Sequence, residues 1–509
     1  ELKQRSETHK SGRVRRRTTT NNWVEDNVYA NNVDLTSDGN ILMNFRKVGA
    51  PADNKGVFAQ GVNFNAKGGI IGLSDGNIYV QGTKDRLNSV FNSHTTKRFM
   101  GVRYGSGSDY VSDTREKYKL SQLYGEAGIT YDAQGKLKVE GADIQTQGNV
   151  YLRGKQGVEI LPGVENSIRE EEHKTSGIKG SFGVSWSGIS AGVGYGKSRD
   201  RISEITKEII ANRLEAAGDV EIKSEEGNVD IYPVNGYIGG KLTLTGKDIN
   251  ILDMQSERIT DRETESSYVG VGVNFGVPAI SAAQQIWEAG KGLTKARHKE
   301  DYINAGFGAF NAGMNAAGAL DGLFTNPIGM SGSINVSHNR SRYHREESIS
   351  VGSNLRIGKG VEYNGNNLHT RGLNIINEGD TVYNITGKII KEAGKSTIKE
   401  TSGSRGYGLS LAKGMLDSNG NINVFKDGNL TATAGVSRQK GESEAVYYSN
   451  NEDITKGKTT YNNNPEVKVV GVDVKTKEIE GSVKSLDIIS VQDSVNGKSR
   501  GYSVNVGIG

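Results

Sequence analysis

Apolar and polar residues alternate along much of this chain in short runs, and glycines separate the runs. Residues 218–253 contain four such runs, each opened by a glycine next to a polar residue. Val220 and Ile222 share one side of the first run, as Val229 and Ile231 do in the second. A period of two is typical of a β-strand with one buried face, and a glycine beside a polar residue is a turn signal. The segment therefore predicts four short strands joined by tight turns.

The same pattern returns along the chain and predicts a repeating architecture. It recurs at residues 33–45, 135–161, 353–376 and 467–491. Short strands at this spacing suit a parallel β-helix, because each coil needs to bury only a few aliphatic residues against its neighbours. An all-β sandwich uses similar strands but seldom extends over this length as one series. We therefore expect an all-β fold, an elongated right-handed parallel β-helix (a solenoid).

A second pattern interrupts the strand blocks and predicts protruding β-hairpins. In residues 175–198, Gly or Ser alternates with Ile, Phe, Val, Trp or Tyr, which gives a two-stranded ribbon with one apolar face. Hairpin-bearing units of this kind are expected near residues 95–120, 174–210, 262–350, 401–450 and 497–509. An isolated hairpin is only marginally stable in water. The ribbons should therefore pack on the solenoid, pair with each other or meet a partner.

The unit that begins near residue 262 carries an insertion at residues 279–323 that is expected to be helical. Its first half has apolar or small residues three or four positions apart, and its second half repeats a small residue every fourth position. These residues are Ile280, Ala283, Trp287 and Gly290, followed by Ala305, Ala309, Gly313 and Ala317. A face of small residues lets another helix approach closely. Two interpretations stay open: two short helices packed against each other at the hairpin tip, or a membrane-active helical pair.

Composition supports a solenoid and excludes several classes of protein. Glycine accounts for 69 of 509 residues and proline for only 6, which fits many tight turns and argues against collagen and Pro-rich disorder. The hydrophobic fraction of 34 % is below the roughly 45–50 % of ordinary domains, so burial must be spread over many coils. The chain has no cysteine, which excludes disulfides and thiolate metal sites. Its net charge of +4 predicts neither a nucleic-acid binder nor a strongly steered membrane binder.

No motif predicts a catalytic or cofactor-binding residue, and the chain is expected not to be an enzyme. Residues 192–198 and 393–397 each end like a phosphate-binding loop. The glycine that should open the motif is replaced by Ala191 in the first case and by Ile389 in the second. We therefore predict no nucleotide site and no cofactor.

The sequence gives equally little support for a metal site or for a catalytic pair of carboxylates. His338 and His344 share a strand face but stand about 20 Å apart, too far for one metal ion, so no metal site is predicted. The carboxylate runs at residues 170–172 and 225–226 are interpreted as solvated turns, without an apolar setting that would raise a pKa. A carbohydrate-active β-helix with acids stacked on one face stays open as an alternative, and turnover of uronate polymers would reveal it.

The densest basic cluster is Arg13–Arg17, which precedes a strand block. We interpret it as an exposed strand that returns to the solenoid, with contact to an anionic glycan or lipopolysaccharide as the alternative. Nucleic-acid binding would require basic residues interleaved with aromatics over a surface, so no nucleic-acid partner is expected. The chain begins at Glu1 without a signal-peptide pattern, and we expect it to be a fragment of a longer protein.

The order of these features resembles the haemagglutinin repeats of bacterial two-partner-secretion exoproteins, a family that includes filamentous haemagglutinin-type adhesins and contact-dependent growth inhibition effectors. Residues 481–494 look like a last coil with the family's Ser-x-Gln-Asp signature, and residues 498–509 look like the entry to the next glycine hairpin. Residues 252–256 occupy the equivalent place earlier but lack the Asp after Gln. The strand at 216–222 and the Ala-rich insertion also look like this family, most of all like the second repeat region of the growth inhibition exoproteins.

The resemblance implies a secreted protein of the bacterial cell surface and several kinds of partner. The first hypothesis is an adhesin section that contacts a receptor, glycan or outer membrane of another cell. The second is the translocation region of a growth inhibition toxin exoprotein, which engages the target outer membrane. An outer-membrane transporter would bind a segment that is not present here. Aromatic residues of the ribbons and the insertion are the predicted contact residues: Trp186, Tyr195, Tyr268, Phe275, Trp287, Phe307, Phe310 and Tyr407.

Overall fold

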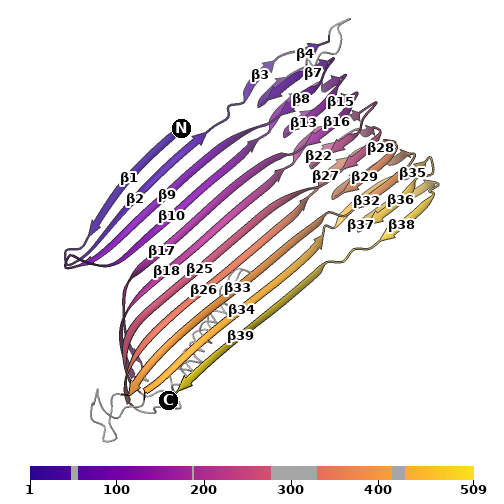
Figure 1. Ribbon diagram of the computed structural model, residues 1–509. Coiled ribbons are helices and arrows are strands. Elements are labelled where there is room, and N and C mark those ends of the chain that lie inside the picture. Colours follow the sequence, from indigo (N-terminus) through magenta and orange to yellow (C-terminus); the bar gives the residue numbers. More distant parts are fainter. Residues whose placement is uncertain (47–55, 186–187, 277–328, 415–429, 509) are drawn as a thin grey trace.

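The protein consists of a β-solenoid and a large sheet of hairpins that extends from one side of it (Figure 1). The computed structural model describes residues 1–46, 56–185, 188–276, 329–414 and 430–508, and every regular element among them is a β-strand. The strands form three sheets of 11, 18 and 10 strands. The predicted all-β parallel β-helix with protruding hairpins is confirmed. The helical insertion expected at 279–323 lies outside the described residues.

The solenoid has three faces, and each coil contributes one strand to each face. The first face contains β3 (Val33–Ser37), β6 (Val62–Ala66), β11 (Ser121–Gly125), β14 (Ala142–Thr146), β19 (Asn212–Ala216), β22 (Val234–Ile238), β27 (Ser353–Ile357) and β30 (Leu373–Asn377). The second contains β4 (Ile41–Phe45), β7 (Gly69–Ser74), β12 (Gly128–Ala133), β15 (Asn149–Gly154), β20 (Val220–Lys223), β23 (Lys241–Thr245), β28 (Gly360–Gly365) and β31 (Asp380–Ile385).

The third face is the separate 10-stranded sheet, so the described chain makes ten coils. It contains β5 (Val57–Gln60), β8 (Ile78–Gln81), β13 (Lys136–Glu140), β16 (Gly157–Leu161), β21 (Val229–Ile231), β24 (Asp248–Ile251), β29 (Asn367–Arg371), β32 (Lys388–Glu392), β36 (Glu466–Val470) and β38 (Ser485–Ile489). In the last two coils, β35 (Asn451–Asn462) and β37 (Val472–Gly481) each run through both of the other faces. They join these two ladders into one 18-stranded sheet, all of it parallel.

The hairpins form one continuous antiparallel sheet, which we call the hairpin sheet. Its strands are β1 (Leu2–Ser11), β2 (Arg15–Val28), β9 (Thr83–Phe99), β10 (Val102–Lys119), β17 (Gly163–Ser185), β18 (Gly188–Ile210), β25 (Met254–Gly276), β26 (Gly329–Val351), β33 (Lys395–Gly414), β34 (Leu430–Tyr448) and β39 (Ser494–Ile508). Each hairpin leaves the third face and returns to the first, so all of them leave at the same corner of the solenoid. Of the three outcomes expected for the ribbons, pairing with each other is the one observed.

The spacing of the hairpins explains why they can pair. A hairpin follows every second coil, as β9 and β10 follow the coils that end in β5 and β8. Neighbouring strands of a sheet lie about 4.8 Å apart, so two coils rise by about 9.6 Å and one hairpin is also about 9.6 Å wide. Because the two repeats match, each hairpin meets the next at pairing distance and no gap accumulates along the solenoid.

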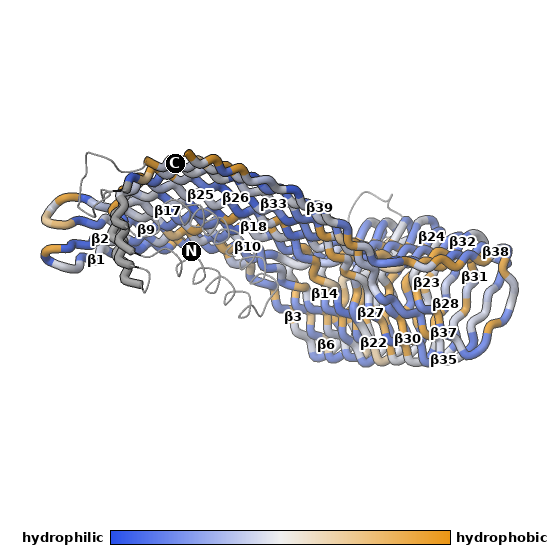
Figure 2. The backbone as a smooth tube through the Cα atoms, turned by 90° about the horizontal axis from the view of Figure 1, so that it is seen from below, coloured by the Kyte–Doolittle hydropathy of each residue, from blue (hydrophilic) through white to orange (hydrophobic). Residues whose placement is uncertain are grey.

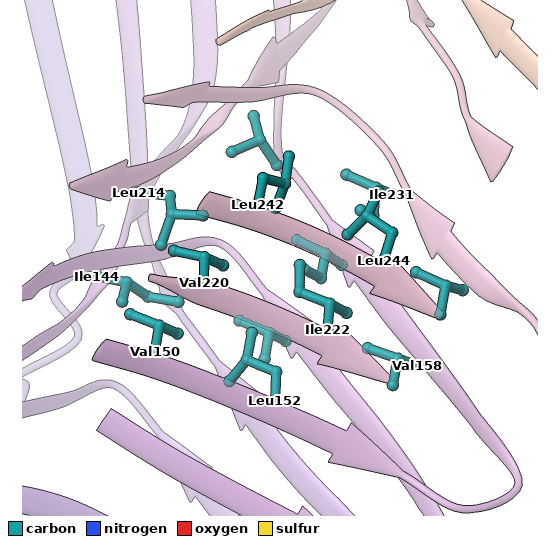
Figure 3. Close-up of a cluster of buried hydrophobic side chains, with 14 of the residues drawn as sticks. Ile144, Val150, Leu152, Val158, Leu214, Val220, Ile222, Ile231, Leu242 and Leu244 are labelled. Atoms are coloured by element: carbon teal, nitrogen blue, oxygen red, sulfur yellow. The ribbon is translucent and has the colours of Figure 1, made fainter. Parts of the chain in front are cut away.

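Stacked aliphatic side chains fill the solenoid. Val150, Val220 and Leu242 lie directly above one another in successive coils of the second face, as do the leucine and isoleucine two residues further along each strand (Figure 3). They are buried, and each such side chain contributes about 1.5–3 kcal/mol of stabilisation relative to full exposure. The alternation seen in the sequence thus places one side of every short strand in this narrow core.

Polar and aromatic residues also stack from coil to coil. Tyr363, Tyr383 and Tyr461 occupy equivalent positions, with ring centroids 5.2 and 5.0 Å apart and nearly parallel rings. On the outside, Asn384 donates a side-chain hydrogen bond to Asn364 over 2.7 Å and accepts one of equal length from Asn462. Identical residues at the strand spacing therefore reinforce the backbone ladder with side-chain contacts.

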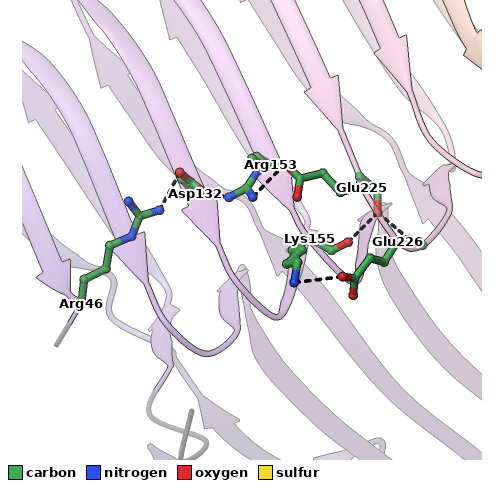
Figure 4. Close-up of polar contacts among 8 residues, drawn as sticks. Arg46, Asp132, Arg153, Lys155, Glu225 and Glu226 are labelled. Atoms are coloured by element: carbon green, nitrogen blue, oxygen red, sulfur yellow. Dashed lines mark hydrogen bonds and ion pairs between the residues drawn. The ribbon is translucent and has the colours of Figure 1, made fainter. Parts of the chain in front are cut away.

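Ion pairs cross several coils on the outer surface of the solenoid (Figure 4). Asp132 in β12 lies between Arg46 and Arg153, with its carboxylate 2.6 Å from the Arg46 guanidinium. Arg153 in turn reaches Glu225 at 2.9 Å, in the turn that follows β20. The side chain of Arg153 is only 13 % exposed, so this pair is screened less than an ordinary surface pair.

One interpretation of the charge runs is wrong. Glu170–Glu172 do not form a turn but lie in the middle of β17, where they alternate between the two faces of the hairpin sheet. Cross-strand cations explain this, because Arg199 of β18 lies 2.5 Å from the Glu172 carboxylate. The run Glu225–Glu226 does lie in a turn, as expected.

Candidate interaction surface

The register of the hairpin sheet decides which side chains share a face. Residues directly opposite each other in neighbouring strands point to the same side of a sheet. One row across the sheet consists of Ile178, Tyr195, Val269, Val336, Leu409, Ala434 and Val506. We call this side the Tyr195 face. The adjacent row lies on the opposite side and contains Gly177, Gly196, Tyr268, Ser337, Gly408, Gly435 and Asn505, and we call that side the Tyr268 face.

The Tyr195 face carries a broad apolar area in the half of the sheet far from the solenoid. Three neighbouring rows contribute side chains that are 44 to 72 % exposed: Ile178, Val193, Tyr195, Val269, Val271, Ile334, Tyr407, Leu409, Val436, Val504, Val506 and Ile508. Two of the aromatic rings contact polar neighbours. Lys197 Nζ lies 5.9 Å from the centre of the Tyr195 ring, and the His338 ring packs against the Tyr407 ring. Large contiguous patches of exposed apolar side chains are rare on soluble proteins, and they often mark binding sites.

The Tyr268 face is flatter and more polar, because small residues dominate it. A side chain at Gly194 or Gly270 would collide with Tyr268, whose ring lies across both glycines. Nearer the solenoid, hydroxyl groups pair across strands, as Thr175 and Ser198 do over 2.6 Å. The alternation of Gly or Ser with apolar residues, which identified the ribbons in the sequence, therefore separates a small-residue face from an apolar one.

Between the apolar area and the solenoid, the Tyr195 face is charged. Glu263 pairs with both Arg340 and Arg342, the latter at 3.3 Å. Partial burial works against ionisation of Glu263, but the hydrogen bonds from the two arginines outweigh it and hold the pKa of that carboxyl below its usual range. Hydrogen bonds to Asp261, and then to Glu346, raise the pKa of His344. The two histidines weighed as metal ligands thus have other partners.

The structure places two of the predicted contact residues on one face of the hairpin sheet and a third on the other. Tyr195 and Tyr407 lie exposed on the same face, whereas Tyr268 points to the opposite one. The backbone of Phe275 pairs with Ile189 and Met330 near the tip of its hairpin. Four further predicted residues lie outside the described part of the chain: Trp186, Trp287, Phe307 and Phe310.

The aliphatic and basic members of the Tyr195 face are not among the residues predicted from the sequence. Val436, Val504 and Leu409 extend the apolar area, and Arg405 and Arg438 lie beside it. The alternation within each strand shows that such residues share a side of that strand. Only the pairing register between strands that are distant in sequence shows that they share one surface.

Two features are absent from the residues that the structure describes. Within these ranges, no group of three or more His, Asp or Glu side chains is arranged to hold a metal ion. The same residues include no helix of the length and apolar character that crossing a membrane requires.

Comparison with known proteins identifies the repeats. A family model described as "Hemagglutinin repeat" matches residues 102–208, 193–306 and 328–506, which together are more than half of the chain. These ranges contain most of the hairpin sheet and the coils between its hairpins.

One relative among curated proteins is the "16S rRNA endonuclease CdiA" of Enterobacter cloacae subsp. cloacae. It is 25 % identical over 286 residues, which cover 52 % of this chain but 8 % of the relative. The chain therefore spans a small part of that protein's length. No solved structure matches the chain.

Proposed function

This chain belongs to the hemagglutinin-repeat family, and we propose that it is a non-enzymatic section of a secreted filament on the bacterial cell surface that mediates contact or adhesion between cells. The observation that carries the proposal is the hairpin sheet, whose Tyr195 face presents a broad, exposed apolar area beside the solenoid. The solenoid supplies length and stiffness through its backbone ladders. The sheet supplies repeated contacts, so that weak interactions with another cell surface add through effective concentration.

A cell-binding measurement tests this proposal. The purified chain, labelled with a fluorophore, should bind to bacterial cells, and binding should fall in a variant that carries Tyr195→Ser, Tyr407→Ser and Val504→Ser. All three residues are exposed on the Tyr195 face, so the substitutions remove apolar contact area without opening the core. The matched control is Ser337→Thr with Asn505→Ser, two small changes on the Tyr268 face. If the unaltered chain does not bind to any cell, the proposal is wrong.

A second function has specific support in the similarity to CdiA. We infer as an alternative that the chain is the translocation region of a contact-dependent growth inhibition exoprotein and engages the outer membrane of the target cell. Every backbone group must be paired inside a membrane, and a long antiparallel sheet meets most of that requirement. Association of the purified chain with outer-membrane vesicles tests the alternative. Deletion of residues 279–323 should reduce that association. Unchanged association would contradict a role for this segment in engaging the membrane and leave the alternative without its main support.

A further inference from the structure

Three arginines stand side by side on the Tyr195 face. Arg340 of β26 lies directly opposite Arg405 of β33, which lies directly opposite Arg438 of β34. Side chains in such positions are about 5 Å apart at their Cβ atoms, and like charges placed there destabilise a sheet. A row of three therefore works against folding, which points to a role outside the fold.

The charges of this row are only partly neutralised. Arg340 pairs with Glu263, a carboxylate that it shares with Arg342. Among the residues that the structure describes, Arg405 and Arg438 have no carboxylate within ion-pairing distance, and both side chains are exposed. Two adjacent guanidinium groups thus keep all of their donors available. Guanidinium is the side-chain group best suited to bidentate binding of carboxylate, sulfate or phosphate.

The row borders a hollow of about 830 Å³ in the hairpin sheet. Arg405 and Arg438 line it, together with Arg342 and Lys440 of the next row. Two carboxylates also line it, but Glu263 is paired with Arg340 and Arg342, and Asp261 with His344. Gly403 lies between Arg342 and Lys440 in that row and leaves the floor open. A Cβ atom at Gly403 would have only the Gln439 carbonyl oxygen within 4 Å, at 3.8 Å, so the space above this position is open.

Two tyrosines adjoin the arginines. Tyr502 lies directly opposite Arg438 and is 59 % exposed, and Tyr407 follows Arg405 by two residues on the same face. An exposed tyrosine offers an apolar ring and a hydroxyl group together. The surface therefore combines unpaired guanidinium groups, an open hollow and amphipathic rings, which suits a ligand that carries both acidic groups and ring faces.

We propose that this hollow binds an anionic polysaccharide, whose acid groups are held by Arg405 and Arg438 and whose sugar rings pack against Tyr407 and Tyr502. The proposal rests on the cell-surface role proposed above and names the class of molecule that the surface contacts. The arginines accept any bidentate oxyanion, so the source of the acid group is an outcome of the test. Because the site is exposed to solvent, binding weakens as salt concentration rises.

Dextran sulfate, polygalacturonate and neutral dextran are the probes, with binding to the purified chain measured by calorimetry. Dextran sulfate and neutral dextran share a backbone, so only the charged polymer should bind, and polygalacturonate reports whether carboxylates suffice. Arg405→Gln with Arg438→Gln should weaken binding of the charged polymers about tenfold or more, because charge-assisted hydrogen bonds are lost. Gly403→Leu should weaken it similarly by filling the hollow, without any change in charge. Circular dichroism confirms that each variant is folded.

The control for net charge is Arg213→Gln with Arg356→Gln. These two arginines are exposed and lie on the solenoid, in β19 and β27, away from the hollow. The control should leave affinity within about twofold of the unaltered chain. Equal loss in the control, equal binding of neutral dextran, or full binding by the Arg405 and Arg438 variant would each overturn the proposal. Cell binding is measured separately, so a chain that binds to cells but to none of the charged polymers refutes this inference and not the contact function.

Discussion

At the scale of single residues, the interior of the solenoid contains a charged pair. The Lys391 side chain is 3 % exposed and donates hydrogen bonds to Asp453 over 2.5 Å and to the Tyr383 hydroxyl over 2.8 Å. Burial alone would lower the pKa of Lys391, but the charge of Asp453 outweighs it and raises that pKa. The lysine is therefore held protonated between two coils, beside the stacked tyrosines.

Removing one partner of this pair should be costly. We expect Lys391→Met to destabilise the surrounding coils by about 3 kcal/mol, because it leaves the Asp453 carboxylate without its counter-charge in a largely buried position. Hydrogen exchange of amides in β31, β32 and β35 measures the change. Lys475→Met, which breaks an exposed pair with Glu452, should change stability by less than about 1 kcal/mol. An equal effect of both substitutions would show that the buried position of Lys391 is unimportant.

Buried tyrosines make the fold sensitive to alkali. Burial, with a smaller contribution from the charge of Glu140, raises the pKa of Tyr118 to about 12, and burial raises the pKa values of Tyr363 and Tyr383 as well. In the unfolded chain these groups ionise near pH 10. Above that pH the unfolded state releases protons that the folded state retains, so the free energy of unfolding falls as pH rises.

Urea unfolding at a series of pH values should show this loss beginning near pH 10 and continuing toward the folded-state pKa values. Tyr118→Phe removes one titrating group and should make the decline shallower. Its hydroxyl donates a hydrogen bond to the Glu140 carbonyl at 3.2 Å, so the variant also starts from slightly lower stability at neutral pH. A stability that stays constant to about pH 11 would contradict the expectation.

At the scale of elements, the sequence predicts the strands better than it predicts their partners. Val220, Ile222, Val229 and Ile231 are buried, because alternation with a period of two places each of them on the inner side of its strand. The alternating Gly and apolar residues of 175–198 likewise predict a ribbon with one apolar face. Residues 165–174, which are mostly charged or polar, show no such alternation, since both faces of the hairpin sheet accept paired ions there. Alternation therefore could not show how far the hairpin strands extend.

The candidate site was less accessible from the sequence for a related reason. Arg405 and Arg438 come from the two strands of one hairpin, but Arg340 comes from the preceding hairpin, and nothing local marks the three as neighbours. The register of Arg340 against Arg405 depends on the match between two coils and one hairpin. That match depends on how many coils lie between successive hairpins. The sequence does not show this number, because the strands are short and the turns vary in length.

Changing the number of coils tests this match. Deletion of residues 353–372 removes one coil, since Ser353 and Leu373 occupy equivalent positions in β27 and β30. The hairpin β33–β34 would then lie about 4.8 Å along the solenoid axis from the hairpin that ends in β26, instead of about 9.6 Å. The two hairpins would therefore compete for the same position in the sheet. We expect this hairpin to detach and to become sensitive to limited proteolysis.

Deletion of residues 353–450 is the matched control. It removes two coils and one hairpin together, so β26 can pair directly with β39 in the way that β34 does. This shorter chain should resist protease as the full chain does, because stability in a repeat protein is approximately a sum over neighbouring units. If the single-coil deletion is equally resistant, the hairpin sheet does not depend on the two-coil spacing.

At the scale of the whole molecule, the two ends of the described solenoid expose their core positions. Val33 and Leu35 in the first coil stand in register with buried Val62 and Phe64, yet they are 62 and 46 % exposed. At the other end, Leu486 and Ile488 are 56 and 74 % exposed, although their register partners in β36 are buried. Among the described strands, those of the first and last coils have a pairing partner on one side only, and β3 and β38 lie at opposite ends of the solenoid in Figure 2. Exposed apolar side chains on unpaired strand edges promote edge-to-edge association.

The isolated 509-residue chain should therefore associate end to end as its concentration rises. Sedimentation velocity should show species larger than a monomer, and Leu486→Lys with Ile488→Lys should reduce them, because two charges in the last coil oppose stacking of a second solenoid. Ile178→Lys with Val504→Lys places the same charges on the apolar face of the hairpin sheet and serves as the control. A control that abolishes association would assign self-contact to the hairpin sheet. In that case the Tyr195 face would be occupied by a second copy before it could meet another cell, and the apolar contacts assigned to adhesion would belong to filament assembly.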